Sequence, residues 1–242
     1  MFRHRADSEW SARRDNFVLG KSMARQVPIG VLISGSGTNL QSIIDAVAAQ
    51  KLDVKIEVVL SNKADAYGVV RAQNHGIPAE VLEHKNYPSR EAYDQAVVDL
   101  LRSRGVELVV LAGFMRLLSP VFIAAYSNRI MNIHPALLPS FPGLHVQKKA
   151  LEHGVRFSGC TVHFVNEECD EGPIIIQAVV PVFPDDTEET LAARILTQEH
   201  RIYPRALQLY AEGRLHIAGR KVLVDGVEKN DAQVLIQPPI EG

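Results

Sequence analysis

Short apolar runs alternate along the chain with segments in which apolar residues recur every three or four positions. The recurrence is clearest at Leu40, Ile43, Ile44 and Val47, where it predicts an amphipathic helix. The run Leu108 to Leu111 is apolar on both faces, as is typical of a central strand in a parallel sheet. Alternating elements of this kind predict a doubly wound, mostly parallel α/β sheet with right-handed crossovers. The expected strands are 27–33, 55–60, 79–82, 108–111 and 129–133, and further helices are expected at 66–75 and 89–101.

The pattern changes after Pro139 and predicts a mixed C-terminal part of the sheet. Residues 157–165 alternate in polarity, and a second strand is expected at 174–180, joined to the first by the acidic segment 166–171. The alternation divides the first of these strands into a face with Cys160, Val162 and Phe164 and a face with Thr161 and His163.

Two local signals mark the end of the chain. Asp186 with Glu189 has the spacing of a capping box and predicts a long helix, which Pro204 should bend. Farther on, Asp225-Gly226 follows the run 221–224 and is typical of a two-residue hairpin turn. Residues 214–242 are therefore expected to form a C-terminal hairpin or tail that packs on the domain or trails from it.

Composition and charge narrow the classes of function. Hydrophobic residues at 46% and charged residues at 22% are ordinary values for a globular protein. A formal net charge of −2 argues against a broad nucleic-acid surface, so an anionic ligand must be met locally. The longest apolar run, 106–115, is too short to cross a bilayer.

The cysteines and the first residues bear on the compartment. Cys160 and Cys169 are the only cysteines; they match no zinc spacing and make no disulfide scaffold, which favours a reduced, cytoplasmic setting. Residues 1–26 are rich in Arg, Ser and Asp and lack the apolar core of a signal peptide. We expect them to be a disordered extension, with Met23 as a candidate start.

A glycine-rich turn joins the first expected strand to the first expected helix, and it reads Ser34-Gly35-Ser36-Gly37-Thr38-Asn39. Backbone N–H groups at a helix start lack partners within the helix and carry the positive end of its dipole, so such a turn can bind a phosphate. The sequence is neither G-x-G-x-x-G nor a P-loop, which argues against dinucleotide and nucleoside triphosphate ligands. A tight strand-to-helix turn without a ligand explains the pattern equally well.

A polar pair lies at the tip of the strand expected at 129–133. Asn132 and His134 share one face of this strand, Ile133 lies on the other, and Pro135 ends the strand. An amide donor beside an imidazole can hold a developing oxyanion, although the same residues can also satisfy turn backbone. Ligands of doubly wound sheets bind at the carboxyl ends of the strands, where both this pair and the glycine turn are expected.

Five segments occur in an order that resembles one enzyme family. Together they resemble the phosphoribosylglycinamide formyltransferases, folate-dependent enzymes of purine synthesis. The Asn-x-His and Asp-x-Gly-Pro pieces are shared by formyltransferases that use 10-formyltetrahydrofolate, whereas the glycine turn and Gln198-Glu199-His200 are typical of the glycinamide ribonucleotide branch. The segments are 33–41, 60–66, 112–116, 132–135 with 137–139, and 170–173.

The resemblance implies a Rossmann-like formyltransferase fold in a domain at 27–213. It also implies a cytoplasmic enzyme of IMP biosynthesis, a monomer or homodimer, whose substrates are glycinamide ribonucleotide and the co-substrate 10-formyltetrahydrofolate. No metal, nucleic acid or membrane is implied. Two departures are mild: Thr38 stands where Ser is also usual, and Glu171 replaces a frequent Gly.

Matching positions carry the roles that the resemblance implies. Asn132, His134 and Asp170 would be catalytic. The acceptor phosphate and ribonucleotide would bind at Gly37, Thr38, Asn39, Leu40 and Gln41, with Glu199 on the glycinamide portion. The folate would bind at Arg71, Met115, Arg116, Leu117, Leu118, Asn132, Asn166, Glu167, Glu168, Cys169 and Asp170.

Acyl-transfer chemistry then gives an expected mechanism. The acceptor amine attacks the formyl carbon, Asn132 donates a hydrogen bond to the new oxyanion, and a protonated His134 adds positive charge. Asp170 favours the imidazolium and helps to move a proton from the attacking amine to the departing folate nitrogen. No metal is needed, because the formyl donor is already activated.

Simpler roles remain open for several of these residues. Asp170 is otherwise a turn residue before Gly172-Pro173, and Arg116 a surface ion pair. Glu199 is otherwise an exposed charge on a long helix. His163 is expected to support the site rather than to act in it.

Three alternative functions use the same formyl donor, 10-formyltetrahydrofolate, and a fourth involves no reaction. A formyltetrahydrofolate hydrolase is expected to carry an extra N-terminal domain, and a methionyl-tRNA formyltransferase an added C-terminal RNA-binding domain and a basic surface. A sugar-nucleotide formyltransferase is excluded least firmly. A non-catalytic nucleotide-binding module would bind ligands without turnover.

Overall fold

The computed structural model describes residues 25–227 together with 235 and 237; the expected extension 1–26 therefore lies almost entirely outside the described residues. The strands are β1 (Val27–Ile33), β2 (Val54–Ser61), β3 (Ala79–Val81), β4 (Leu108–Leu111), β5 (Ile130–His134), β6 (Phe157–Phe164), β7 (Ile174–Pro181), β8 (Leu215–Ala218) and β9 (Lys221–Val224). The helices are α1 (Thr38–Ala48), α2 (Tyr67–Asn74), α3 (Arg90–Ser103), α4 (Pro120–Ala125), α5 (Val146–Glu152) and α6 (Glu188–Ala211), with a 3₁₀ turn η1 (His84–Asn86).

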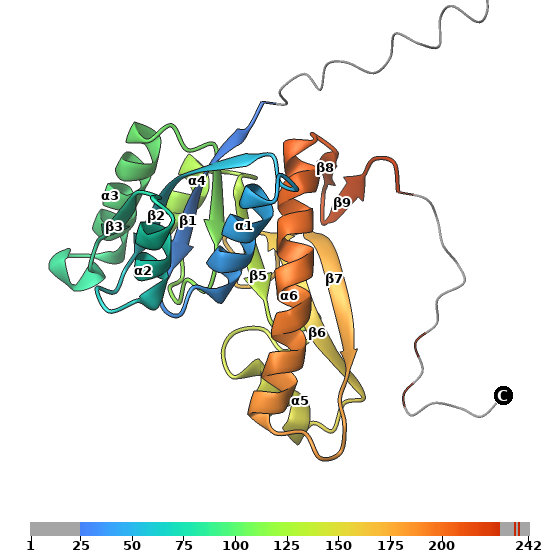
Figure 1. Cartoon of the computed structure of the whole chain (residues 1–242). Coiled ribbons are helices and arrows are strands. Elements are labelled where there is room, and N and C mark those ends of the chain that lie inside the picture. The colour runs from blue at the N-terminus through green and yellow to red at the C-terminus, as the bar shows by residue number, and fades with distance from the viewer. Residues whose placement is uncertain (1–24, 228–234, 236, 238–242) are drawn as a thin grey trace, which may run out of the picture.

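All described strands form one sheet in the order β3-β2-β1-β4-β5-β6-β7-β9-β8 (Figure 1). The first five strands pair in parallel, whereas β6 is antiparallel to both β5 and β7. The order reverses at β1, which lies between β2 and β4. The expected doubly wound, mostly parallel sheet with a mixed C-terminal part is confirmed. In such sheets ligands bind at the carboxyl ends of the strands, near the switch in strand order, which lies here between β1 and β4.

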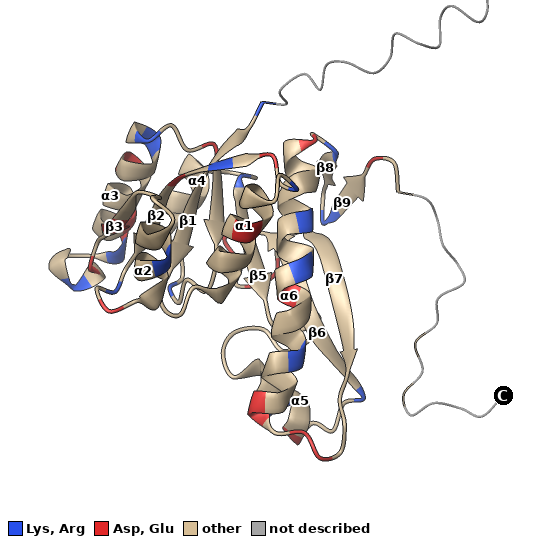
Figure 2. Ribbon diagram, viewed as in Figure 1, with Lys and Arg blue, Asp and Glu red and all other residues tan. Residues whose placement is uncertain are grey.

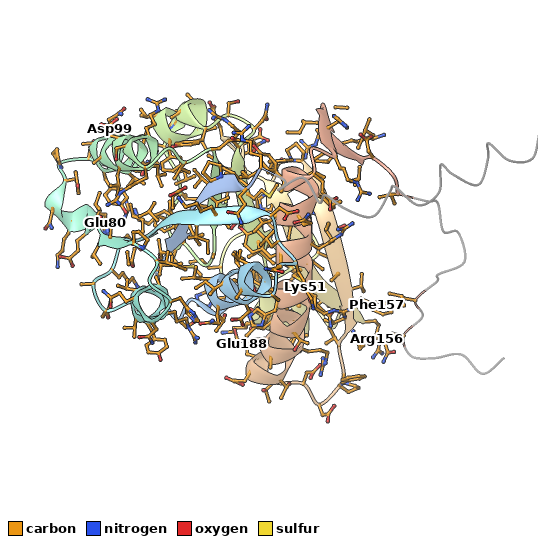
Figure 3. All side chains as sticks on the ribbon, turned by 45° about the horizontal axis from the view of Figure 1, so that its top comes forward. Lys51, Glu80, Asp99, Arg156, Phe157 and Glu188 are labelled. Carbon is orange, nitrogen blue, oxygen red and sulfur yellow. The ribbon has the colours of Figure 1, made fainter. Side chains whose placement is uncertain are left out.

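Helices cover both faces of the sheet. Helices α1, α2 and α6 pack on one face, and α3 and α4 pack on the other (Figure 1). The buried faces are those that the apolar spacing predicted: Leu40, Ile43 and Ile44 of α1 and Tyr93 and Val97 of α3 all lie in the core. Figure 3 labels Glu80 on the edge strand β3, Asp99 on α3, which covers one face, and Phe157 at the start of the inner strand β6.

The elements expected from periodicity are present, and their ends agree to within two residues. Local signals near the C-terminus were less accurate. The cap of α6 is Thr187, which exchanges hydrogen bonds with Thr190, so the expected capping box of Asp186 with Glu189 is wrong. The side chain of Asp186 instead forms a bidentate pair with Arg194. Helix α6 continues through Pro204 as one helix.

The C-terminal hairpin is present, but its turn lies elsewhere. Strands β8 and β9 pair from Leu215↔Val224 to Ala218↔Lys221, so the connection is Gly219-Arg220, and Asp225-Gly226 comes after the hairpin. Asp225 there bonds back to His216 and Arg214. The hairpin extends the sheet through β9, which joins β7.

Charges of both signs are interspersed along α3 and α6 (Figure 2). No helix in the described ranges combines the length and apolar character needed to cross a bilayer. Because the surface charges are mixed, a charged ligand must be bound by nearby charged or polar groups rather than attracted by a field of one sign.

Candidate active site

A cavity of about 830 Å³ opens at the carboxyl ends of β4 and β5. Three segments surround it: the loops 113–118 and 165–170, which follow β4 and β6, and residues 143–147, which lead into α5. Its size is within the usual range for a small-molecule site, and its position fits the rule for doubly wound sheets. The lining residues are Arg90, Leu111, 113–118, Pro120, Ile123, 132–135, 143–147, His163 and 165–170.

The register of β5 and β6 assembles a polar wall for this cavity. Asn132 lies opposite His163, and His134 lies opposite Thr161, so four polar side chains share one face. Ile133 packs into the core on the other face, as predicted. Thr161 holds the chain after β5, because its hydroxyl donates to Ala136 O at 2.7 Å and accepts the Leu138 N–H at 3.1 Å. The loop after His134 is thereby fixed.

Asn132 is oriented by a neutral histidine. The Nδ1 of His163 is 2.9 Å from the carbonyl oxygen of Phe164, to which it donates, so Nε2 is left as an acceptor. Burial lowers the pKa of His163, which keeps the ring neutral near pH 7. The Nδ2 of Asn132 therefore donates one hydrogen to His163 Nε2, at 3.2 Å. Its second N–H has no partner among the described residues, and Asn132 lines the cavity.

His134 and Asp170 form the second polar unit. The Nε2 of His134 donates to Phe141 O at 2.9 Å, which leaves Nδ1 directed at the carboxylate of Asp170. Nδ1 and Asp170 Oδ2 are 3.5 Å apart, and the Oδ1 of Asp170 is 3.8 Å from His163 Nε2. His134 is only 4% exposed, so this pair interacts with little solvent screening.

A close backbone approach brings Asp170 from a distant loop to the tip of β5. Gly172 crosses over the end of β6, and a side chain there would lie 1.7 Å from Phe164 O, so only glycine fits. Asp170 itself has φ 57°, a left-handed conformation that Asp tolerates better than most residues. Its Oδ2 accepts the Gly143 N–H at 2.9 Å, which ties the loop to the opposite wall of the cavity.

Two arginines line another part of the cavity. The guanidinium of Arg116 lies 4.9 Å above the ring of Tyr93, and its buried Nε has no partner in the structure. Arg116 forms no salt bridge among the described residues, so a surface ion pair is not supported as its role. Arg90, which the sequence motifs did not indicate, also lines the cavity. It is the first residue of α3, and its Nε lies 3.6 Å from the carboxylate of its neighbour Glu91.

The glycine turn forms a separate polar site beside α6. Gly37 has φ 69°, and a side chain there would lie 2.6 Å from the Cα of Gly68, so the turn requires glycine on both counts. Asn39 donates to Glu199 at 2.6 Å, and both residues are buried. Glu199 is thus not an exposed charge on the long helix. Burial raises the pKa of its carboxyl, and the hydrogen bond from Asn39 opposes the rise.

The structure separates the expected residues into these two sites. All expected folate residues line the cavity except Arg71, which lies against the glycine turn instead. A folate role for Arg71 thus lacks support from the shape of the cavity. Leu40 is fully buried in the core, so it can offer a ligand only its backbone.

Within the described part of the chain, no three or more His, Cys, Asp or Glu side chains form a cluster that could hold a metal ion.

Cys169 lies beside Asp170, and burial together with that carboxylate raises the pKa of its thiol. The thiol is therefore a weak donor to Asp170 Oδ2, 3.5 Å away.

Comparisons with known proteins agree with one another. A profile of the formyl transferase family matches residues 27–207. The phosphoribosylglycinamide formyltransferase of Escherichia coli (strain K12) is 48% identical over 198 residues, which cover 82% of this chain and 93% of that protein. The trifunctional purine biosynthetic protein adenosine-3 of Drosophila pseudoobscura pseudoobscura is 53% identical over 77% of this chain and 14% of its own length. The crystal structure of glycinamide ribonucleotide transformylase 1 from Symbiobacterium toebii matches with a TM-score of 0.82 at 55% identity, covering 83% of this chain and 94% of that one.

Proposed function

The chain belongs to the formyl transferase family, and we propose that its cavity is where a formyl group passes from 10-formyltetrahydrofolate to the amine of glycinamide ribonucleotide. This reaction belongs to de novo purine biosynthesis, and the folate is a co-substrate. The observation that carries the proposal is the meeting of Asn132, His134 and Asp170 at the wall of one cavity. A donor amide, an imidazole and a carboxylate are the groups that formyl transfer to an amine requires.

Asn132 supplies the direct hydrogen bond to the transition state. The acceptor nitrogen forms a bond to the formyl carbon, and the formyl oxygen becomes an oxyanion. The second N–H of Asn132 is free to donate to this oxyanion, because the first is held by His163 Nε2. The oxyanion collapses as the bond from the formyl carbon to the folate nitrogen breaks.

His134 and Asp170 supply the proton transfer. The attacking amine must lose a proton, and the departing folate nitrogen must gain one. Both ring nitrogens of His134 have partners, so we ascribe to it electrostatic support rather than a direct hydrogen bond to the oxyanion. Asp170, whose carboxylate lies 3.5 Å from His134 Nδ1, accepts the proton that the attacking amine loses and passes it to the departing folate nitrogen, directly or through water.

The charges along the cavity suggest an orientation for the folate. Arg90 and Arg116 lie on one part of the wall, and Glu167, Glu168 and Asp170 on another. A folate carries its carboxylates at the end remote from the pterin. We place that anionic end at the two arginines, which leaves the formyl-bearing nitrogen within reach of His134 and Asp170.

Replacing Arg90 by Leu should raise the KM for the folate about tenfold or more, because a charge-assisted hydrogen bond to a carboxylate is lost. The kcat and the KM for the acceptor should stay within about twofold, since Arg90 is remote from the reacting atoms. Steady-state kinetics with each substrate varied in turn would measure this. Arg102→Leu, which removes an exposed cation from the last turn of the same helix, is the matched control. An unchanged folate KM in Arg90→Leu would contradict the orientation.

We further propose a cytoplasmic enzyme, acting as a monomer or homodimer, with a formyltransferase domain at 27–213. Both cysteines are free, which fits a reducing compartment. Residues 214–242 would then be an accessory segment, of which the described hairpin β8–β9 extends the sheet.

A spectroscopic assay of tetrahydrofolate release tests the function directly. With 10-formyltetrahydrofolate, the whole chain should release tetrahydrofolate only when glycinamide ribonucleotide is present, and mass spectrometry should find the formylated acceptor in equal amount. Release without acceptor would indicate a hydrolase instead. Turnover with a sugar nucleotide in place of glycinamide ribonucleotide would indicate a sugar-nucleotide formyltransferase. Ligand binding without any turnover would indicate a non-catalytic binding module.

A further inference from the structure

A guanidinium is fixed at the glycine turn with no carboxylate partner, and we propose that Arg71 of α2 binds the phosphate of the acceptor. This inference rests on the function proposed above. It reassigns Arg71 from the folate, the role implied by resemblance, to the other substrate.

Four contacts hold the side chain of Arg71 in place. Its Nε donates to Ser36 O at 2.8 Å, and its Nη1 donates to the side-chain oxygen of Gln41 at 3.2 Å. The guanidinium lies 5.0 Å from the ring centre of Tyr67, and the methylene stem packs beside Gly37. A cation restrained in this way loses little conformational entropy when it binds an anion.

The charge of Arg71 is not neutralised within the described residues. None of their carboxylates lies within salt-bridge distance of it, and both of its hydrogen-bond acceptors are neutral. Two of the five guanidinium N–H groups are used, which leaves three for a ligand. His200 lies on the neighbouring part of α6, but burial lowers its pKa, so the imidazole adds no full charge near pH 7.

The surroundings of the turn independently indicate a missing ligand. Asn39 is only 8% exposed, and its Oδ1 is buried without a hydrogen-bond partner, as is Nε2 of His200. Buried polar atoms without partners are rare in folded proteins. The Oδ1 of Asn39 can only accept, so a hydroxyl or amine of the ribonucleotide would satisfy it, whereas the N–H groups at the start of α1 and the guanidinium of Arg71 are the donors available to its phosphate.

The cavity gives no competing role to Arg71. It is absent from the cavity wall, where Arg90 and Arg116 are the cations that can meet the carboxylates of the folate. The two substrates thus have separate cationic anchors, Arg71 at the glycine turn and Arg90 with Arg116 at the cavity. A tight anchor on the phosphate also explains how the enzyme would select a ribonucleotide over an unphosphorylated amine.

The test compares glycinamide ribonucleotide with glycinamide riboside, the same acceptor without its phosphate. Arg71→Leu should raise the KM for the ribonucleotide about 10- to 100-fold at saturating folate. The KM for the riboside and the KM for the folate should change less than twofold. Inorganic phosphate should inhibit the unchanged protein competitively with the ribonucleotide, and this inhibition should weaken in the variant.

Two further variants make the result decisive. Arg71→Lys should recover part of the ribonucleotide affinity, since charge remains but the fork geometry is lost. Lys51→Leu removes a cation just beyond the opposite end of α1 (Figure 3) and should leave both acceptors unaffected. If Arg71→Leu raises the KM for the ribonucleotide and the riboside equally, the turn is merely distorted. If it raises only the KM for the folate, Arg71 binds the folate. Either result overturns the inference. If the unchanged protein is inactive with every acceptor, the proposed function itself is refuted. If Arg71→Leu has unchanged kinetics, only the role of Arg71 is refuted and the proposed function stands.

Discussion

Asn132→Ala is expected to lower kcat about 10²- to 10³-fold, the usual cost of removing one donor to a developing oxyanion. The structure gives the reason in atomic terms. His163 holds one hydrogen of the amide, and the other has no partner among the described residues, so it is available to the oxyanion in the cavity that Asn132 lines. Because the oxyanion exists only after attack, the KM values for both substrates should change little.

Folding has to be measured beside the kinetics for this variant. Asn132 is partly buried and bonds to one side chain, so thermal denaturation and folate titration of Asn132→Ala should stay close to those of the unchanged chain. A variant with normal folate affinity and near-normal kcat would remove Asn132 from the chemistry. A loss of folate affinity with kcat unchanged would show instead that Asn132 binds the ground state and the transition state equally.

Periodicity was enough to predict the sheet and most helices, because burial dictates which positions are apolar. It also placed Asn132 and His134 on one face of β5 and Thr161 and His163 on one face of β6. Strand register, which no single segment encodes, then brought the two pairs together. The pairing of Asn132 with His163 thus required the three-dimensional structure.

Long-range contacts and isolated charges were the harder part. Asp170 reaches His134 only because Gly172 allows its loop to cross the end of β6. Arg90 belongs to no motif, and Arg71 is assigned to a site by where α2 packs rather than by its neighbours in sequence. Glu199 has the sequence pattern of a surface charge, and only the packing of α1 against α6 covers it with Asn39.

The predicted cap of α6 and the predicted hairpin turn were wrong because several neighbouring residues at each position have similar chemistry. Asp186, Thr187 and Thr190 all have oxygens that suit a helix start, and the one that caps α6 is set by the pairing of Asp186 with Arg194. Gly219 and Gly226 both adopt positive φ, but only Gly219 lies between strands that can pair. Local turn propensity cannot decide between two such glycines.

Asp170→Asn is expected to lower kcat by about 10²–10⁴-fold, the range for losing a general acid–base group. Asn keeps the shape and can still accept the Gly143 N–H, so the loop should stay in place. What is lost is the negative charge opposite His134 Nδ1 and the ability to relay a proton. The pH profile of kcat should change as well. Since burial lowers the pKa of His163 and keeps it neutral near pH 7, that change reports on the His134–Asp170 pair.

The double variant decides whether the two residues act as one unit. If they share a proton, adding His134→Ala to Asp170→Asn should cost little more than the worse single change, whereas independent roles would multiply the two losses. Glu171→Gln removes a charge from the next residue of the same loop, which is exposed and near Arg220, and it should leave kcat within about twofold. Full multiplication of the losses would separate Asp170 from His134. A single Asp170→Asn variant with normal kcat and an unaltered pH profile would remove the carboxylate from the mechanism, because the fold offers no second acid that contacts both histidines among the described residues.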